Sequence, residues 1–218
     1  MAAKEPAEET PTEETGRPAR DGSASPPGAS PSPEKPLLMV DIDGVISLFV
    51  GFAGHAPWAT GPAGPDGCRY ETIDGIPHCL SRTAAAHLLE LTAEFEPVWA
   101  SGWEEKAEEN LPRLLGLPAG LPFLRFERSP GRGNAHWKLA AIDEHAGSRP
   151  LAWIDDAFND SCHAWARARP APTLLVQTVP EHGLTSREAS RLTTWAQSLA
   201  PPPAAARDSR APEVTPRR

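Results

Sequence analysis

The chain has 218 residues and a formal net charge of −8, from 29 acidic and 21 basic side chains. Half of its 26 prolines lie in residues 1–36 and 201–218, two ends that are poor in large apolar residues, so we predict disordered Pro-rich tails around a core of residues 37–200. The core carries 20 acidic and 13 basic residues, and this net charge of −7 argues against a domain that binds nucleic acid through a general positive field.

The cysteines and the uncharged stretches indicate in which cellular compartment the protein is expected. Cys68, Cys79 and Cys162 are an odd number without a CxxC spacing, which fits neither a disulfide framework nor a structural zinc module. The first ten residues are charged and contain no apolar run, and the longest uncharged stretch, residues 44–65, is broken by glycine and proline. We therefore expect a cytoplasmic protein without a membrane span.

Along the core, short apolar runs alternate with amphipathic stretches, the pattern of βα units around a mainly parallel sheet. The runs that predict strands are residues 37–42, 97–100, 121–126, 151–154 and 173–177. The stretches that predict helices are residues 83–95, 104–115, 135–146, 158–168 and 186–199. Residues 47–80 are rich in glycine and proline and predict an inserted flap or hairpin. The expected fold class is α/β with a five-stranded sheet covered by helices on both faces.

Polar side chains follow three of the predicted strands. Asp41 and Asp43 come directly after the first strand, Ser101 after the second, and Asp155 and Asp156 after the fourth. Ligands of open α/β sheets bind outside the carboxyl ends of the strands, so a parallel sheet would bring these side chains together. Carboxylates this close repel one another unless a hard cation neutralises them, and this favours Mg²⁺.

Lys138, at the start of a predicted helix, adds a positive charge to this set. A cation, a lysine and a serine hydroxyl together can stabilise the charged oxygens of a phosphoryl group. A carboxylate in line with the phosphorus can then act as a nucleophile and form an aspartyl-phosphate. The residue types therefore point to phosphoryl transfer.

The ordered elements resemble the four motifs of the haloacid dehalogenase (HAD) superfamily over residues 37–199. They are Asp41-Ile42-Asp43-Gly44-Val45, Ser101 after PVWA, Lys138, and Asp155-Asp156 with Asp160 four residues beyond. More narrowly, the runs VWASGWEEKAEENLPRLLGLP, LAWIDD and GLTSREASRLTTWA resemble the HAD-domain family associated with Swiss-army-knife RNA repair proteins. The resemblance implies a Rossmannoid three-layer sandwich with a minimal cap or none.

The resemblance also implies a role for each residue. Asp41 would be the nucleophile and a Mg²⁺ ligand. Asp43 would act as general acid and base and offer its backbone carbonyl to the metal. Lys138 would offset the charge of nucleophile and phosphate, and Asp155 or Asp156 would complete the magnesium shell, with Asp160 as a helper. Substrate contacts are expected from Gly44, Ser101, Gly102, Trp103 and Arg132.

Several of these residues have simpler interpretations. Asp-Gly is common in turns, and Ser101 could cap a helix in a Ser-x-x-Glu box with Glu104. Lys138 could be a solvated helix residue and Trp103 a packing residue rather than a platform for a base. Two further groups have possible roles: three arginines could guide a polyanion (Arg125, Arg128, Arg132), and four residues of the flap could bind zinc (His55, Cys68, His78, Cys79).

The expected function is a Mg²⁺-dependent phosphohydrolase that acts through an aspartyl-phosphate. An open, capless site favours a nucleic-acid phosphate end, as in RNA repair, over a nucleotide or another small phosphate, although a flap hairpin could shield a small substrate. The alternatives are a non-catalytic or weakly catalytic partner module of an RNA-processing complex, and a phosphotransferase with an acceptor other than water.

Overall fold

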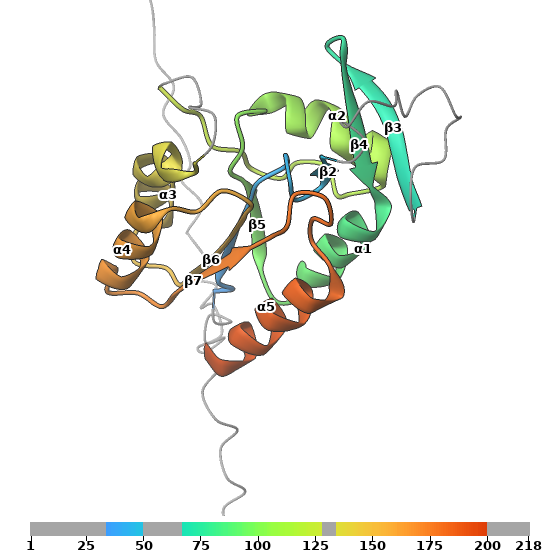
Figure 1. The fold of residues 1–218 in the computed structure, drawn as a ribbon. Helices are drawn as coiled ribbons and strands as arrows, with labels where there is room; N and C mark the ends of the chain where they lie inside the picture. The colour runs from blue at the N-terminus through green and yellow to red at the C-terminus, as the bar shows by residue number, and fades with distance from the viewer. Residues whose placement is uncertain (1–33, 50–66, 128–133, 200–218) are drawn as a thin grey trace, which may run out of the picture. The chain divides into compact units, whose positions relative to one another are not determined.

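The computed structural model describes residues 34–49, 67–127 and 134–199. Their main sheet has four parallel strands in the order β5 (Glu96–Trp99), β1 (Leu37–Val40), β6 (Leu151–Asp155) and β7 (Thr173–Gln177) (Figure 1). β1 is central and completely buried. Its last residue, Val40, pairs with Trp99 of β5 and Ile154 of β6. The three strands therefore end level, and the residues that follow them meet at one edge.

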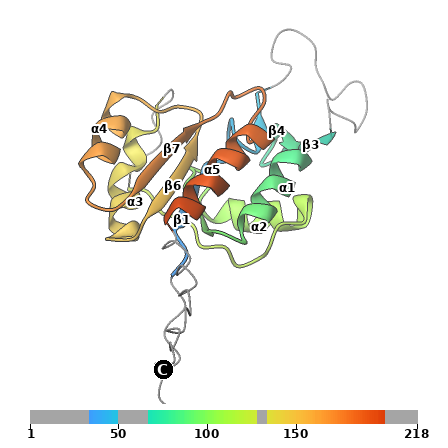
Figure 2. The ribbon, with the colours of Figure 1, turned by 90° about the horizontal axis from the view of Figure 1, so that it is seen from below.

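Helices cover both faces of this sheet (Figure 2). α1 (Arg82–Leu91), α2 (Glu105–Leu115) and α5 (Ser186–Leu199) lie on one side, and α3 (Leu139–Ala146) and α4 (Asp160–Ala168) on the other. The side chains of β1 alternate between the two layers: Leu38 and Val40 belong to the core with α1, α2 and α5, and Leu37 and Met39 to the core with α3 and α4. The α/β class with helices on both faces is thus confirmed.

The five predicted helices are present with shifted ends. α1 stops at Leu91, four residues early, and α4 begins two residues late, where the Asn159 side chain accepts a hydrogen bond from the Cys162 amide and caps the helix. The predicted helix at residues 135–146 opens with a 3₁₀ turn, η3 (His136–Lys138), before α3. Among the described residues, no helix is long and apolar enough to cross a membrane.

The prediction of a strand at residues 121–126 is wrong, and the main sheet of the described residues has four strands instead of five. This segment runs beside β5 but makes a single bridge, between Phe123 and Trp99. The Trp99 amide donates to the Pro122 carbonyl at 2.8 Å, and the Leu124 amide donates to the Trp99 carbonyl at 2.9 Å. Pro122 has no amide hydrogen to donate on one side of this bridge, and on the other side the Phe126 amide donates to the Glu104 carboxylate instead of to β5.

The described segments within and next to the predicted insertion at residues 47–80 form a second sheet. β2 (Ser47–Leu48), β4 (Ile76–Ser81) and β3 (Cys68–Ile73) pair antiparallel in that order. Asp74 and Gly75 form the β3–β4 turn with positive φ values of 53° and 77°, as a tight hairpin turn requires. Residues 1–33, 50–66, 128–133 and 200–218, which include most of the two predicted tails, lie outside the described residues.

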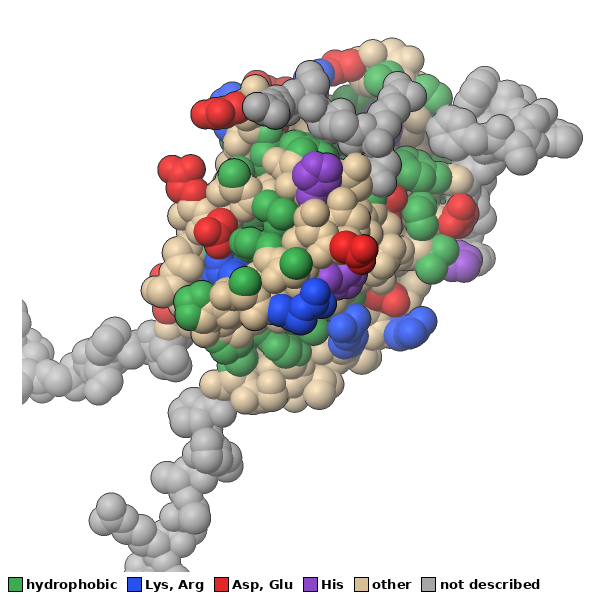
Figure 3. Space-filling model, turned by 60° about the vertical axis from the view of Figure 1, so that its left-hand side comes forward, with side chains coloured by type: hydrophobic (Ala, Val, Ile, Leu, Met, Phe, Trp, Pro, Cys, Tyr) green, Lys and Arg blue, Asp and Glu red, His purple; other side chains and the backbone are tan. Residues whose placement is uncertain are grey.

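The face shown in Figure 3 carries acidic and basic side chains among hydrophobic ones. A separate cluster of acidic side chains, Asp41, Asp155 and Asp156, lies at the carboxyl edge of the main sheet.

Candidate active site

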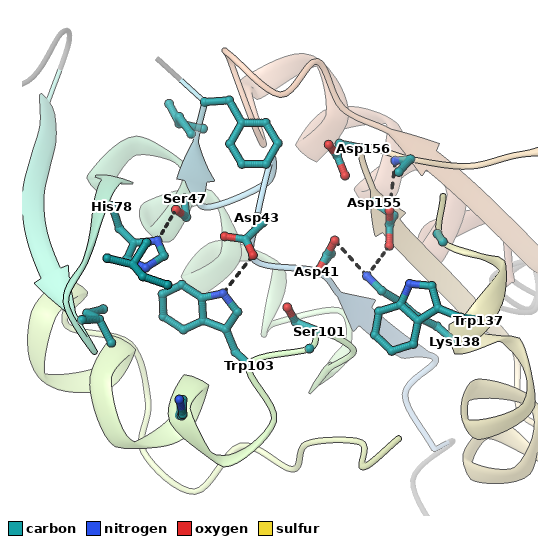
Figure 4. Close-up of a pocket in the computed structure, with 18 of the residues that line it drawn as sticks. Asp41, Asp43, Ser47, His78, Ser101, Trp103, Trp137, Lys138, Asp155 and Asp156 are labelled. Carbon is teal, nitrogen blue, oxygen red and sulfur yellow. Dashed lines mark hydrogen bonds and ion pairs between the residues drawn. The ribbon is translucent and has the colours of Figure 1, made fainter. Parts of the chain in front are cut away.

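The carboxyl edge of the main sheet opens into a cavity of about 750 Å³. The level ends of β1, β5 and β6 bring Asp41, Ser101 and Asp155 to its floor (Figure 4). The predicted residues that line it are Asp41, Asp43, Ser101, Gly102, Trp103, Lys138, Asp155 and Asp156. Residues as far apart in the sequence as Asp41 and Asp156 therefore share one cavity, as the strand-end pattern predicts.

Lys138 is the centre of this cluster. Its side chain is buried, with 3% of the residue exposed, and its Nζ lies 2.8 Å from Asp41 Oδ2 and 2.7 Å from Asp155 Oδ2. Burial alone would lower the pKa of the ammonium, but the two carboxylates outweigh burial and raise the pKa of Lys138 above its ordinary value. The interpretation of Lys138 as a solvated helix residue is wrong, because the η3 turn directs its side chain into the cavity.

The backbone fixes the second oxygen of each of these carboxylates. The Ile42 amide donates to Asp41 Oδ1 at 2.8 Å, and the Ala157 amide donates to Asp155 Oδ1 at 3.0 Å. Burial and the nearby charge of Asp41 raise the pKa of Asp155 to about 7, although the charge of Lys138 and its hydrogen bond act to lower this pKa. One ammonium therefore does not fully compensate the negative charge of the site.

Asp156 brings a third carboxylate to the same point. One oxygen each from Asp41, Asp155 and Asp156 lies within 4.8 Å of the others, a spacing at which one metal ion can contact all three. Burial, and next the charge of Asp41, raises the pKa of Asp156. Three oxygen ligands and an excess of negative charge suit a hard divalent cation such as Mg²⁺. The residues present thus fit the predicted metal.

Gly44 makes the approach of Asp156 possible. Gly44 has a φ of +73°, and a Cβ at this position would lie 2.5 Å from Asp156 Cγ. Two residues at the end of β7 hold Gly44 and Asp156 in position. Thr178 Oγ1 donates to the Gly44 carbonyl at 2.8 Å, and Gln177 Nε2 donates to the Asp156 carbonyl at 3.1 Å. Sequence reasoning missed Gln177 and Thr178, although they end a predicted strand as the other site residues do.

Replacing Gly44 with alanine is expected to weaken Mg²⁺ binding at least about tenfold, because the methyl group would push Asp156 away from the cluster. Gly75→Ala is the matched control. Gly75 has nearly the same φ, +77°, but a Cβ there meets nothing within 4 Å, so it shares the backbone strain of about 1–2 kcal/mol without the collision. Calorimetric titration with Mg²⁺ separates the two, and equal affinities in both variants would contradict this account of Gly44.

Asp43 faces away from the three-carboxylate cluster. Trp103 Nε1 donates to Asp43 Oδ2 at 3.0 Å, and the Trp103 ring packs edge-on against His78, whose Nδ1 lies 3.0 Å from Ser47 Oγ. Burial and the charge of Asp41 raise the pKa of Asp43 to about 6, although the Trp103 hydrogen bond and Lys138 oppose this. The Asp43 carboxyl can thus gain or lose a proton near neutral pH. Its predicted role as a metal ligand involves only its backbone carbonyl.

Ser101 lies in the cavity and does not cap a helix. It is 2% exposed, and α2 begins after Glu104 without any side-chain cap. The Glu104 carboxylate instead accepts a hydrogen bond from the Phe126 amide at 2.9 Å. The capping-box alternative for Ser101 is therefore wrong, and its hydroxyl is available to a ligand in the cavity.

Other candidate residues lie elsewhere. Asp160 is exposed at the start of α4, and Arg125 is ion-paired to Glu105 at 3.3 Å; neither lines the cavity. Cys68 and Cys79 are free thiols that pack together with Leu48. Within the described part of the chain they join no cluster that could hold a metal. His55, Arg128 and Arg132 lie outside the described residues.

The assembled groups have complementary chemical uses. Three carboxylates can hold a divalent cation, Lys138 and Ser101 can contact an anion beside it, and Asp43 can exchange a proton within the same cavity. No protein-family model matches the chain, and no curated protein matches its sequence.

Proposed function

We propose that this protein is a Mg²⁺-dependent phosphohydrolase of HAD type that acts through a phosphorylated Asp41. One observation carries the proposal: buried Lys138 bridges Asp41 and Asp155 beside Asp156, at the level ends of parallel strands. A site with fixed carboxylates, an excess of negative charge and one buried ammonium suits a cation and a phosphoryl group better than it suits a structural ion pair.

In the proposed reaction an oxygen of Asp41 forms a bond to phosphorus while the bond to the ester oxygen breaks. Asp43 gives its proton to the departing ester oxygen. In the second step the Asp43 carboxylate takes a proton from a water molecule, which attacks the phosphorus and releases inorganic phosphate and the Asp41 carboxylate. A pKa of about 6 for Asp43 suits both directions of proton transfer.

The surrounding residues hold these groups in position. The Ile42 amide and Lys138 fix the two oxygens of Asp41, and Trp103 fixes an oxygen of Asp43. Ser101 lines the same cavity, and its hydroxyl would contact a phosphoryl oxygen. Asp41, Asp155 and Asp156, with the Asp43 carbonyl, would hold Mg²⁺, which when bound neutralises the charge on the transferring group.

The test is hydrolysis of p-nitrophenyl phosphate with Mg²⁺ and after removal of Mg²⁺ by a chelator. We expect turnover that depends on Mg²⁺ and that Asp160→Asn, an exposed change outside the cavity, leaves intact. Equal rates with and without the metal would contradict the metal-dependent mechanism. Absence of turnover across a broad panel of phosphate esters, with a protein partner that co-purifies, would favour the partner-module alternative.

A further inference from the structure

The cavity extends well beyond the carboxylates, and its outer part is apolar. We call this part the outer wall; its residues come from the end of β2, the β3–β4 hairpin and the segments around two tryptophans, namely Phe49, Ile73, Ile76, Pro77, Trp103 and Trp137. Figure 4 shows Trp103 and Trp137 on either side of Asp41 and Ser101, with His78 beyond Trp103. A group attached to a phosphate on Asp41 would therefore extend between aromatic side chains.

Two residues of the outer wall are unusually exposed for their type. Phe49 is 44% exposed and Ile76 is 59% exposed, and they are two of the four large hydrophobic residues that are exposed in the described part of the chain. Both line this cavity. Exposed apolar side chains that converge on a pocket beside a reactive cluster are typical of a ligand site.

The outer part of the cavity offers little to a second negative charge. Among the described residues that line it, Asp74 and Lys106 are the charged ones, and they form an ion pair with each other. Burial lowers the pKa of His78, which favours its neutral form. A polynucleotide end carries its next phosphate close to the first, and among the described lining residues that phosphate would meet apolar side chains and the paired Lys106.

The size of the cavity agrees with a small ligand. Its volume of about 750 Å³ lies within the range of roughly 300–1,000 Å³ that is common for small-molecule sites. The β3–β4 hairpin contributes Ile73, Ile76 and Pro77 to one side of it, so the site is partly shielded. A hairpin that shields a small substrate is one of the two alternatives that follow from the sequence.

We propose that the outer wall binds a planar, uncharged aromatic group on the leaving alcohol of a small phosphate monoester. This rests on the proposed function, because the phosphate must sit at Asp41 for its alcohol to reach the outer wall. Aromatic side chains bind rings by stacking and edge contacts, and apolar walls bind them without requiring charge. A small aromatic phosphate ester, rather than a large nucleic-acid end, is then the leading substrate class.

The test compares 2-phenylethyl phosphate with ethyl phosphate. Both are primary alkyl esters, so their phosphates have similar intrinsic reactivity and differ in the ring. We expect the phenyl ester to have a kcat/KM about tenfold higher with the wild-type protein. We also expect it to bind about tenfold more tightly to the Asp41→Asn variant with Mg²⁺, measured by calorimetry.

Ile76→Ser tests the wall itself, and Leu89→Ser is the matched control. Leu89 is 48% exposed on α1 and does not line the cavity. The preference for the phenyl ester should fall at least threefold in Ile76→Ser and stay unchanged in Leu89→Ser. Preferences within twofold of each other in all three proteins would overturn the proposal, as would a preference for a 5′-phosphorylated oligonucleotide over the phenyl ester.

Failure of the two proposals gives different results. If neither ester is hydrolysed but the phenyl ester still binds tenfold more tightly than the ethyl ester, the phosphohydrolase proposal fails and the aromatic subsite is supported. If both esters are hydrolysed at similar kcat/KM, the phosphohydrolase proposal stands and the subsite is overturned.

Discussion

Asp41→Asn is expected to lower kcat for p-nitrophenyl phosphate at least about 1,000-fold, because an amide oxygen is a far weaker nucleophile than a carboxylate and cannot form the aspartyl-phosphate. The substitution changes the shape of the site little. Asparagine has nearly the same size, and its one side-chain oxygen can still accept the hydrogen bond from the Ile42 amide. The loss should therefore appear in kcat, with a KM within a few-fold of the wild-type value.

Two measurements separate this loss from misfolding. Lys138 keeps Asp155 as a partner at 2.7 Å in the variant, and one of several repelling carboxylates is gone. The free energy of unfolding of metal-free Asp41→Asn should accordingly equal or exceed that of the wild-type protein. Asp160→Asn should retain wild-type kcat. A kcat for Asp41→Asn within tenfold of the wild-type value would rule out Asp41 as the nucleophile.

Lys138→Met is expected to lower the free energy of unfolding of the metal-free protein by about 3–5 kcal/mol at pH 7.5. Methionine fills much of the same space, but it leaves Asp41 and Asp155 buried beside each other without their shared ammonium. Urea denaturation at equilibrium measures this loss. Lys106→Met is the control: Lys106 pairs with Asp74 at the surface, where water screens the charges, so a much smaller loss is expected than for Lys138→Met.

The loss of stability caused by Lys138→Met is expected to depend on pH. The folded protein raises the pKa of Asp155 to about 7 and that of Asp43 to about 6, above the value of 3.8 for an ordinary aspartate. The folded state therefore binds more protons than the unfolded state between about pH 4 and pH 7, so the stability contributed by these groups falls as the pH rises through this range. Without Lys138 the carboxylates hold their protons more tightly. The loss caused by Lys138→Met should thus be largest above pH 7 and smaller at pH 5, and a loss that does not depend on pH would contradict the ion-pair account.

Local sequence patterns were sufficient to locate the strand ends and the polar residues after them. Runs such as LLMV and LAWI are apolar at every position because β1 and β6 are covered on both faces. The parallel register then brings Asp41, Ser101 and Asp155 to one edge. The same logic fails for residues 121–126, where an apolar run contains Pro122 and pairs at a single bridge.

The contacts that adjust the site could not be predicted in the same way, because each joins distant elements. Trp103 reaches Asp43 across 60 positions, and Thr178 reaches Gly44 across 134. From the sequence Gly44 is expected to contact the substrate or, as part of an Asp-Gly pair, to form a turn. In the structure it does not line the cavity, and its missing side chain makes room for Asp156. The shape of the outer wall depends on how the β3–β4 hairpin sits over the cavity, and this follows from packing rather than from spacing.

Trapping the phosphoenzyme tests the central claim most directly. The protein is mixed with Mg²⁺ and p-nitrophenyl phosphate, quenched in acid during turnover and treated with borohydride, which reduces an aspartyl-phosphate to homoserine. Peptide mass spectrometry then identifies the reduced position. The account predicts reduction at Asp41 in the wild-type protein and none at this position without substrate. Reduction at another aspartate, or turnover with no reduced residue at all, would contradict it.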